Sequence, residues 1–263
     1  MRHRELRILE LLDERGSVRV DELAATLEVS AVTVRKDLEY LEAGGHLVRN
    51  RGGAVRAGLR EGEFPKRLRI DVAAKQAVAV AAARHVAHGD VVAFDTSSTA
   101  YFVAREVVDR QNLVVVTSSL PTATLFLGRP TARVLMPGGT VRHESAGLVG
   151  ANLDQLAGLG RISKGFFGLT GLSVERGLLE FAFDETATKR MLVDACTEVH
   201  AVFASEKAGG FGFHSFCPPD AVTSLITDDG LDAETADLWR ALGVDVELAP
   251  LSGAAEPAVA AWP

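Results

Sequence analysis

The sequence holds few residues of the kinds that crosslink a chain or bind a metal. Its two cysteines, Cys196 and Cys217, cannot form the disulfide framework of a small secreted domain. It contains no zinc-spaced group of histidines and cysteines, no phosphate-binding Walker loop and no nucleophile elbow. We therefore expect no metal site, no cofactor and no set of catalytic residues.

Long apolar runs are also missing. The longest conspicuous run, AVAVAAA at residues 77–83, is far shorter than the roughly 18 residues that a membrane-spanning helix needs. The first residues, MRHRELRILELL, form a charged amphipathic pattern and not the apolar core of a signal peptide. These features predict a cytoplasmic protein without a membrane role.

Charge is unevenly distributed along the chain. The net charge of 263 residues is −7, but residues 1–60 sum to +1 and residues 61–263 to −8. Residues 44–60 contain four arginines and no acidic residue. A local basic segment on an acidic protein favours binding to a polyanion such as nucleic acid.

Residues 1–58 have the pattern of a winged helix-turn-helix. Helical spacing of leucines ends at Gly16, and a second helical pattern covers DELAATLE. A third helix begins after Ser30, a good N-cap residue, and continues to about Ala43. Short strands are expected at residues 46–49 and 54–56, joined by a tight turn at 51–53.

The third helix has one apolar and one polar face. At 100° per residue, Val34, Leu38 and Leu41 point inward. Val32, Thr33, Lys36 and Tyr40 point away from them, and Arg35 lies on the flank. A helix of this kind fits the DNA major groove, and an arginine-rich hairpin can follow the backbone or enter the minor groove. The residues expected to contact DNA are Ser30, Thr33, Arg35, Lys36, Arg49, Arg51 and Arg56. A winged helix that mediates only protein contacts is the alternative.

The rest of the chain predicts an α/β domain. After an exposed linker at 59–72, apolar strands alternate with helices across residues 73–250, and a mobile tail covers 251–263. Strands are expected at 91–95, 113–118, 132–137, 164–170, 200–205 and 224–228, with helices at 72–88, 99–109, 120–127, 184–195 and 233–242. This alternation favours a doubly wound, mostly parallel sheet.

Polar loops follow three of these strands. Carboxyl ends of parallel strands meet at one edge, so the loops are expected to face one ligand. The residues are Asp95, Thr96, Ser97, Ser98 and Thr99, then Thr117, Ser118 and Ser119, then Gly138 and Gly139. Hydroxyl groups at a helix N-terminus suit a phosphate, but they equally serve as helix caps, and the glycines are equally suited to a simple turn.

These motifs together resemble one family. RILELLDERGSVRVDELAATLEVSAVTVRKDLEYLEAGGHLVRNRGGA looks like the DNA-binding domain of DeoR-family bacterial regulators. GDVVAFDTSSTA, LVVVTSSL, VLMPGGTVR, DETATKRML, SEKAGGFG and LITD resemble, in this order, that family's sugar-phosphate-sensing domain, which is related in fold to ribose-5-phosphate isomerase. The resemblance covers nearly all of residues 4–228.

The resemblance adds three residues to the expected effector site. Glu185 and Lys189 match the family helix that faces the ligand, although their i,i+4 spacing is also typical of an exposed ion pair. Lys207 matches the lysine of an Asp-x-x-Lys stretch. The chain departs from the family at Ser98, usually glycine, at Ser118, commonly asparagine, and at Ala204, usually aspartate.

We therefore expect a homo-oligomeric, DNA-binding repressor of a carbohydrate operon that a phosphorylated sugar releases from its operator. Two alternatives stay open. One is an isomerase-like enzyme with a DNA-binding module, for which Asp95, Glu180, Asp184 and Glu185 are candidate bases. The other is an architectural DNA binder that senses no effector.

Overall fold

The computed structural model describes residues 3–15, 17–43, 46–50, 52–56, 62–150, 161–210 and 212–251; at residues 3, 13–15, 50, 55 and 56 it describes the backbone alone. The chain divides into two units, Met1–Gly62 and Glu63–Pro263. We describe each unit by itself. The expected tail at 251–263 lies outside the described residues, apart from Leu251.

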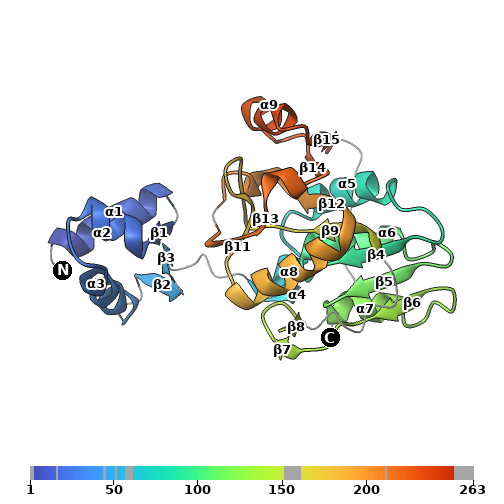
Figure 1. Ribbon diagram of the computed structural model, residues 1–263, viewed down its shortest axis with the longest axis horizontal. Coiled ribbons are helices and arrows are strands. Elements are labelled where there is room, and N and C mark those ends of the chain that lie inside the picture. The colour runs from blue at the N-terminus through green and yellow to red at the C-terminus, as the bar shows by residue number, and fades with distance from the viewer. Residues whose placement is uncertain are drawn as a thin grey trace. The chain divides into compact units, whose positions relative to one another are not determined.

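The N-terminal unit combines helices with a small antiparallel sheet (Figure 1). Its elements are α1 (His3–Arg15), β1 (Ser17–Arg19), α2 (Val20–Thr26), α3 (Ala31–Ala43), β2 (Leu47–Asn50) and β3 (Gly53–Arg56). The strand order is β1-β3-β2, with β3 paired to both neighbours. This is the predicted winged helix-turn-helix, with the β2–β3 hairpin as the wing.

Burial of one face of each helix holds this unit together. Val34, Leu38 and Leu41 of α3 are at most 1% exposed, as their spacing predicts. They pack in one cluster with Ile8, Leu11, Leu12, Val18, Val20, Leu23, Leu47 and Ala54. Asp37 of α3 is also buried, and its carboxylate accepts a hydrogen bond from the Arg4 guanidinium at 2.8 Å. The packed face thus leaves the opposite face of α3 to solvent.

The C-terminal unit is organised around a parallel sheet. Its strands are β4 (Val91–Phe94), β5 (Val114–Thr117), β6 (Arg133–Leu135), β9 (Ile162–Phe167), β12 (Cys196–Phe203), β14 (Ser224–Asp228) and β15 (Asp245–Ala249). The order is β15-β14-β12-β9-β4-β5-β6, and every pairing is parallel. The helices are α4 (Phe64–Arg67), α5 (Val72–Ala83), α6 (Ser98–Glu106), α7 (Leu120–Phe126), α8 (Phe183–Ala195) and α9 (Ala233–Ala241).

Short strands and turns complete this unit. They are the β7–β8 hairpin (Thr140–Arg142 and Gly147–Val149), a small sheet of β10 (Gly171–Ser173), β11 (Gly177–Glu180) and β13 (His214–Cys217), and the 3-10 turns η2 (Ser205–Lys207) and η3 (Pro219–Ala221). The sequence patterns did not predict these strands or β15.

Helices cover both faces of the parallel sheet. Side chains alternate along each strand, so Phe166 belongs to the core cluster that includes α5, α6 and α7, whereas its neighbour Phe167 belongs to the cluster that includes α8 and α9. Both phenylalanines are fully buried. The predicted doubly wound α/β fold is therefore confirmed.

The exposed linker predicted at 59–72 is wrong for its second half. Phe64 and Leu68, at and just after α4, are at most 2% exposed and belong to the core cluster that includes α5 and α6. Two apolar side chains at this spacing dock the short helix onto the sheet domain. The C-terminal unit therefore begins at Glu63, ten residues before the predicted boundary at 73.

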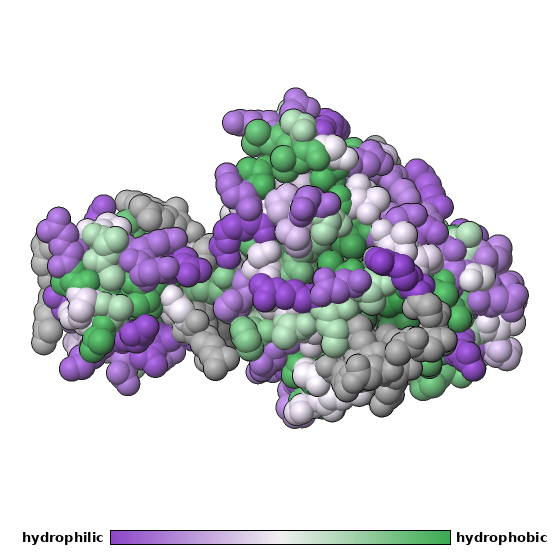
Figure 2. Space-filling model, viewed as in Figure 1, coloured by the Kyte–Doolittle hydropathy of each residue, from purple (hydrophilic) through white to green (hydrophobic). Residues whose placement is uncertain are grey.

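The surface of this unit carries some apolar side chains. Figure 2 shows them gathered over α9, where Leu238 and Leu242 are about half exposed. Cys196 and Cys217 are buried and have free thiols. Among the described residues, no helix is long and apolar enough to cross a bilayer.

His200 of β12 is an ionisable side chain within the core. It is 2% exposed, its ring stacks on Phe166, and its Nδ1 lies 2.7 Å from the hydroxyl of Ser224. Burial, and then the nearby charges of His85 and Lys164, lower its pKa to about 3. The folded protein therefore keeps this imidazole neutral at pH values where a free histidine is protonated.

We predict that His200 makes the fold acid-sensitive. Because the unfolded chain takes up a proton below pH 6.5 and the folded protein does not, the free energy of unfolding falls as pH drops from 6.5 toward 3. The contribution approaches about 1.4 kcal/mol per pH unit. Urea unfolding of wild type and His200→Asn at several pH values measures it, since asparagine keeps an acceptor for Ser224. Parallel pH curves for the two proteins would contradict the prediction.

Candidate DNA-binding and effector sites

The start of α3 is fixed by its cap. The Ser30 hydroxyl accepts a hydrogen bond from the Thr33 amide at 3.2 Å and lies 2.9 Å from the Thr33 hydroxyl. This confirms Ser30 as the predicted N-cap. Two residues expected to contact DNA are therefore held in place by each other.

The outward face of α3 presents two exposed cations. Arg35 and Lys36 are exposed, and within the described part of the chain neither side chain forms an ion pair. Val32 and Tyr40 on the same surface are 61% and 58% exposed. The face combines positive charge with contact area, which a helix that enters a DNA groove needs.

Arg49 differs from this pattern. Its guanidinium lies 3.1 Å from Glu42 and 3.8 Å from Glu39, both on α3, and its amide donates to Glu42. Its charge is therefore partly neutralised within the unit, which the sequence count of basic residues did not reveal. Arg51 lies outside the described residues, as does the side chain of Arg56, so their DNA contacts stay predictions.

In the C-terminal unit, the first two polar loops meet at one edge of the sheet. Phe94 of β4 pairs with Thr117 of β5, and the Thr117 hydroxyl donates to the Phe94 carbonyl at 2.7 Å. Ser97 and Ser119 act as N-caps of α6 and α7, each accepting an amide hydrogen bond three residues on. The helix-capping interpretation of the Asp95–Ala100 loop is therefore confirmed for Ser97, and Ser119 caps α7 in the same way.

The β7–β8 hairpin brings the third loop to the same edge. Leu148 donates its amide to the Ser118 carbonyl at 2.8 Å, and a Cβ at Gly147 would overlap the methyl group of Thr96. The hairpin begins at Thr140, directly after Gly138 and Gly139, which are exposed and have positive φ angles. The glycines therefore turn the chain from β6 into a cover over the other two loops.

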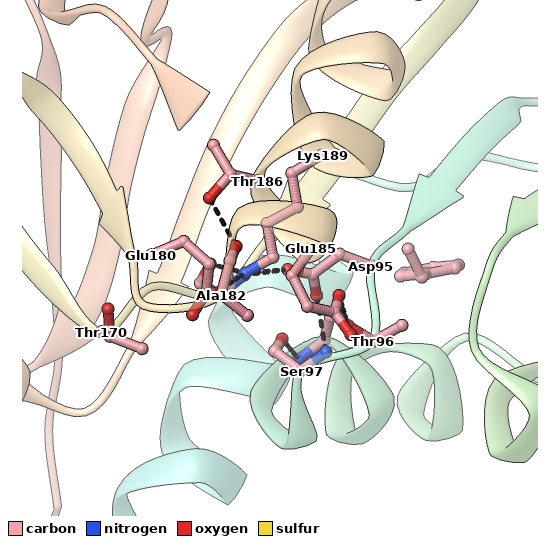
Figure 3. A network of polar contacts seen from close by, with 12 residues as sticks. Asp95, Thr96, Ser97, Thr170, Glu180, Ala182, Glu185, Thr186 and Lys189 are labelled. Carbon is pink, nitrogen blue, oxygen red and sulfur yellow. Dashed lines mark hydrogen bonds and ion pairs between the residues drawn. The ribbon is translucent and has the colours of Figure 1, made fainter. Parts of the chain in front are cut away.

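A buried network of charges lies beneath these loops (Figure 3). The Lys189 ammonium lies 3.0 Å from Asp95, 2.6 Å from Glu180 and 2.8 Å from the Gly168 carbonyl. Asp95 also accepts the amides of Ser97 and Gly168, both at 2.9 Å. Each of the three charged side chains is at most 5% exposed. The network joins the end of β4, the end of β11 and helix α8.

Pairing decides the protonation of this network. Burial alone would lower the Lys189 pKa, but Asp95 and Glu180 outweigh it and hold that pKa above its usual value. Burial alone would raise the Glu180 pKa, but the charge and hydrogen bond of Lys189 outweigh burial and lower the Glu180 pKa. Lys189 and Glu180 therefore stay ionised around neutral pH.

Glu185 extends the network toward the loops. One carboxylate oxygen accepts the Thr96 hydroxyl at 2.8 Å, and the other lies 3.4 Å from the Arg142 guanidinium of β7. Glu185 and Lys189 are 1% and 3% exposed, so the interpretation as an exposed ion pair is wrong. The i,i+4 spacing places both on the face of α8 that packs inward, where tertiary partners replace the local pair.

Lys207 lies on η2, beside the same edge. It is partly buried, and burial and then the charge of Arg67 lower its pKa. Asp228 fixes this turn by accepting the amide and the hydroxyl of Ser205 at 2.7 and 2.6 Å. Asp228 thus holds the turn that follows Ala204. Ala204 is the position at which the family usually has aspartate.

The predicted effector residues divide into two groups. Gly138, Gly139 and Lys207 are accessible. The others are buried, with at most 8% exposure: Asp95, Thr96, Ser97, Ser98, Thr99, Thr117, Ser118, Ser119, Glu185 and Lys189. Sequence reasoning missed Glu180 as the partner of Lys189, and it named neither Arg67 nor Arg142, the last residue of VLMPGGTVR, as a site residue. Among the described residues, no group of three His, Cys, Asp or Glu side chains is placed to hold a metal ion.

A winged helix-turn-helix with an exposed cationic helix, joined to an α/β unit with convergent polar loops, defines a regulator that couples a DNA reader to a ligand-sensing domain. Comparison with known families agrees with this class. Residues 4–58 match the DeoR-like helix-turn-helix domain, and residues 70–229 match the DeoR C terminal sensor domain. The chain belongs to the DeoR family of transcriptional regulators, as its motifs suggested.

Relatives align with nearly the whole chain. The HTH-type transcriptional regulator GolR of Listeria innocua is 31% identical over 94% of this chain and 98% of its own length. The glycerol-3-phosphate regulon repressor of Escherichia coli is 27% identical over 86% of this chain and 96% of its own length. A ribose 5 phosphate isomerase A from Neisseria gonorrhoeae covers 51% of this chain and 52% of its own, with 12% identity and a TM-score of 0.39, a likeness too low to bear on activity.

We predict that Lys189 stabilises the fold through its two carboxylates. Lys189→Met leaves Asp95 and Glu180 buried without their cation, which costs about 3 to 5 kcal/mol of unfolding free energy. Urea denaturation measures this, with Lys66→Met as control because the Lys66 ammonium is exposed and pairs with the exposed Glu63. Adding Asp95→Asn and Glu180→Gln to Lys189→Met removes the uncompensated charges and recovers part of the loss. Equal stability of the two single variants would contradict the role given to Lys189.

Proposed function

We propose that this chain is a repressor that binds an operator as a homo-oligomer and is released when the C-terminal unit binds a phosphorylated sugar or a related phosphate metabolite. The observation that carries this proposal is the buried Asp95–Lys189–Glu180 network at the carboxyl edge of a parallel sheet. Ligands of open α/β sheets bind at that edge. Burying three charges there costs free energy of desolvation, and this cost favours a functional reason for keeping them.

Recognition of DNA is assigned to α3 and the wing. Arg35 and Lys36 are exposed and reach base edges or phosphates when α3 lies in the major groove. Arg49, tied to Glu42, supports the position of the wing more than it adds free charge. Operators of helix-turn-helix proteins usually have two half-sites, and so we assign at least two copies to the bound state.

The effector class follows from the chemistry of the loops. Hydroxyl groups of the loops suit a polyhydroxylated ligand, and nearby cations suit its phosphate. The name of the Escherichia coli relative, glycerol-3-phosphate regulon repressor, agrees with this class. If the effector binds better to a conformation that fits the operator poorly, DNA affinity falls by the coupling free energy, typically about 1 to 3 kcal/mol.

We propose binding without turnover. A proton-transfer base needs a carboxylate that is free to take up a proton from the substrate. Asp95 and Glu180 are instead committed to the Lys189 ammonium, and Glu185 accepts the Thr96 hydroxyl. The fourth candidate base, Asp184, is exposed in the first turn of α8 and is not part of the buried network. Incubation of the full chain with ribose 5-phosphate and other sugar phosphates tests this. Conversion of any of these compounds would contradict binding without turnover and support the isomerase-like enzyme instead.

We predict that the outward face of α3 is required for DNA binding. Arg35→Ala and Lys36→Ala each weaken operator binding by about tenfold or more while the circular dichroism spectrum stays unchanged. Gel shifts on the DNA upstream of the gene measure the affinity. Arg129→Ala, an exposed arginine of the C-terminal unit, is the matched control and binds as wild type does. If both α3 variants bind DNA as tightly as wild type does, the assignment of DNA binding to the outward face of α3 is contradicted.

We predict that a phosphorylated sugar stabilises the full chain and releases DNA. At a hundredfold excess over its dissociation constant, a one-site ligand adds about 2.7 kcal/mol to the free energy of unfolding. Thermal shifts against a panel of sugar phosphates and glycerol 3-phosphate identify it, with the unphosphorylated compounds as controls, and gel shifts with the same compounds follow release. If no compound changes either stability or DNA binding, the chain is an effector-blind DNA binder.

A further inference from the structure

The Arg49 side chain of the wing lies along one flank of α3. Its Nε lies 3.1 Å from Glu42, and its Nη1 lies 3.8 Å from Glu39 and donates to the Arg35 carbonyl at 3.5 Å. Residues 35, 39 and 42 follow one another at i, i+4 and i+7, which is the spacing of one side of a helix. The wing therefore contacts the same flank of α3 that carries Arg35, one of the residues expected to reach DNA.

Glu42 holds the backbone of Arg49 as well as its side chain. One carboxylate oxygen, Oε1, accepts the Arg49 amide at 2.8 Å, and the other, Oε2, faces the guanidinium Nε. β2 is an edge strand of the β1-β3-β2 sheet, so the amides on its free side have no strand partner. Glu42 supplies one of these amides with a partner from α3.

The base of the wing is fixed by other contacts. The His46 amide donates to the Leu41 carbonyl of α3 at 3.0 Å. Leu47, the first residue of β2, is 2% exposed and packs in one cluster with Leu38 and Leu41. Glu42 therefore acts further along β2, on the part of the strand that leads to the β2–β3 turn.

These contacts add no positive charge to the DNA-binding unit. Arg49 carries one positive charge, whereas Glu39 and Glu42 carry two negative charges. Acidic groups beside a surface that binds DNA repel its phosphates. As charge alone, the arrangement opposes DNA binding, and its value to this unit therefore lies in geometry.

We infer that Glu42 is a positioning residue for DNA recognition, which fixes the wing against α3 through Arg49. The inference rests on the proposed function, because it names a residue that sets the geometry of the proposed DNA-binding surface. Without Glu42, Arg49 loses the partner of its amide and its shortest ion pair. The wing then has more conformational freedom, and ordering it on DNA costs more entropy.

The test compares two substitutions that remove the same charge from the same flank of α3. Glu42→Ala weakens binding to the DNA upstream of the gene by about tenfold, although it removes a negative charge. Glu39→Ala binds as tightly as wild type or more tightly, because the Glu39 carboxylate is 3.8 Å from Arg49, beyond hydrogen-bonding distance. Glu42→Gln gives an intermediate affinity, because its side-chain carbonyl still accepts the Arg49 amide. Gel shifts measure the affinities.

The salt dependence of binding separates positioning from a direct phosphate contact. Loss of one phosphate contact reduces the slope of log affinity against log salt concentration by about 0.9. Glu42→Ala and Arg49→Ala therefore keep the wild-type slope while their affinity falls. Circular dichroism shows that the variants are folded, and faster NMR hydrogen exchange of the Arg49 amide in free Glu42→Ala reports the lost hydrogen bond.

The outcomes distinguish this inference from the proposed function. If wild type binds DNA and Glu42→Ala binds as tightly or more tightly, charge alone decides and the inference is overturned, whereas the proposed function holds. A smaller salt slope for Arg49→Ala than for wild type makes Arg49 a phosphate contact and also overturns the inference. If wild type binds no DNA, the proposed function fails, and the inference fails with it.

Discussion

A buried ammonium must be paired, and the C-terminal unit is arranged around that requirement at Lys189. The two carboxylates that satisfy it come from the end of β4 and the end of β11, elements far apart in the sequence. Asp95 in turn accepts the amides that shape the loop after β4. One charge therefore fixes the edge of the sheet at which the polar loops converge, where we propose that the effector binds.

The two units use charge in opposite ways. In the C-terminal unit the Lys189 ammonium is buried and faces two carboxylates, so a ligand would compete with internal partners. On α3 the cations of Arg35 and Lys36 are exposed and have no ion pair among the described residues, which suits a large polyanion that replaces water. A net charge of −7 is compatible with DNA binding because the two functions are separated along the chain.

Much of the fold was predictable because its signals are local. Helical spacing predicted α1, α2 and α3, and the N-cap residue Ser30 predicted the start of α3. Apolar runs predicted most strands of the parallel sheet. The short strands β7, β8, β10, β11 and β13 have too few residues for a clear period, and Glu180 was therefore not recognised as a partner of Lys189. The spacing of Glu185 and Lys189 is the same for a surface pair and a buried network, so only tertiary contacts distinguish the two. Arg49 was counted as free charge because the fold of the wing onto Glu39 and Glu42 is not visible in the sequence.

If effector binding is passed to the DNA-binding unit, it acts through the residues that begin the C-terminal unit, where the Phe64 amide donates to the Glu144 carbonyl of the β7–β8 turn. Hydrogen exchange of the Phe64 amide, followed by NMR in the full chain with and without the responding sugar phosphate, tests it most directly. Slower exchange of this amide in the bound protein, together with slower exchange across residues 140–149, is the predicted result. Exchange at Phe64 that is the same with and without a ligand that releases DNA would contradict the account.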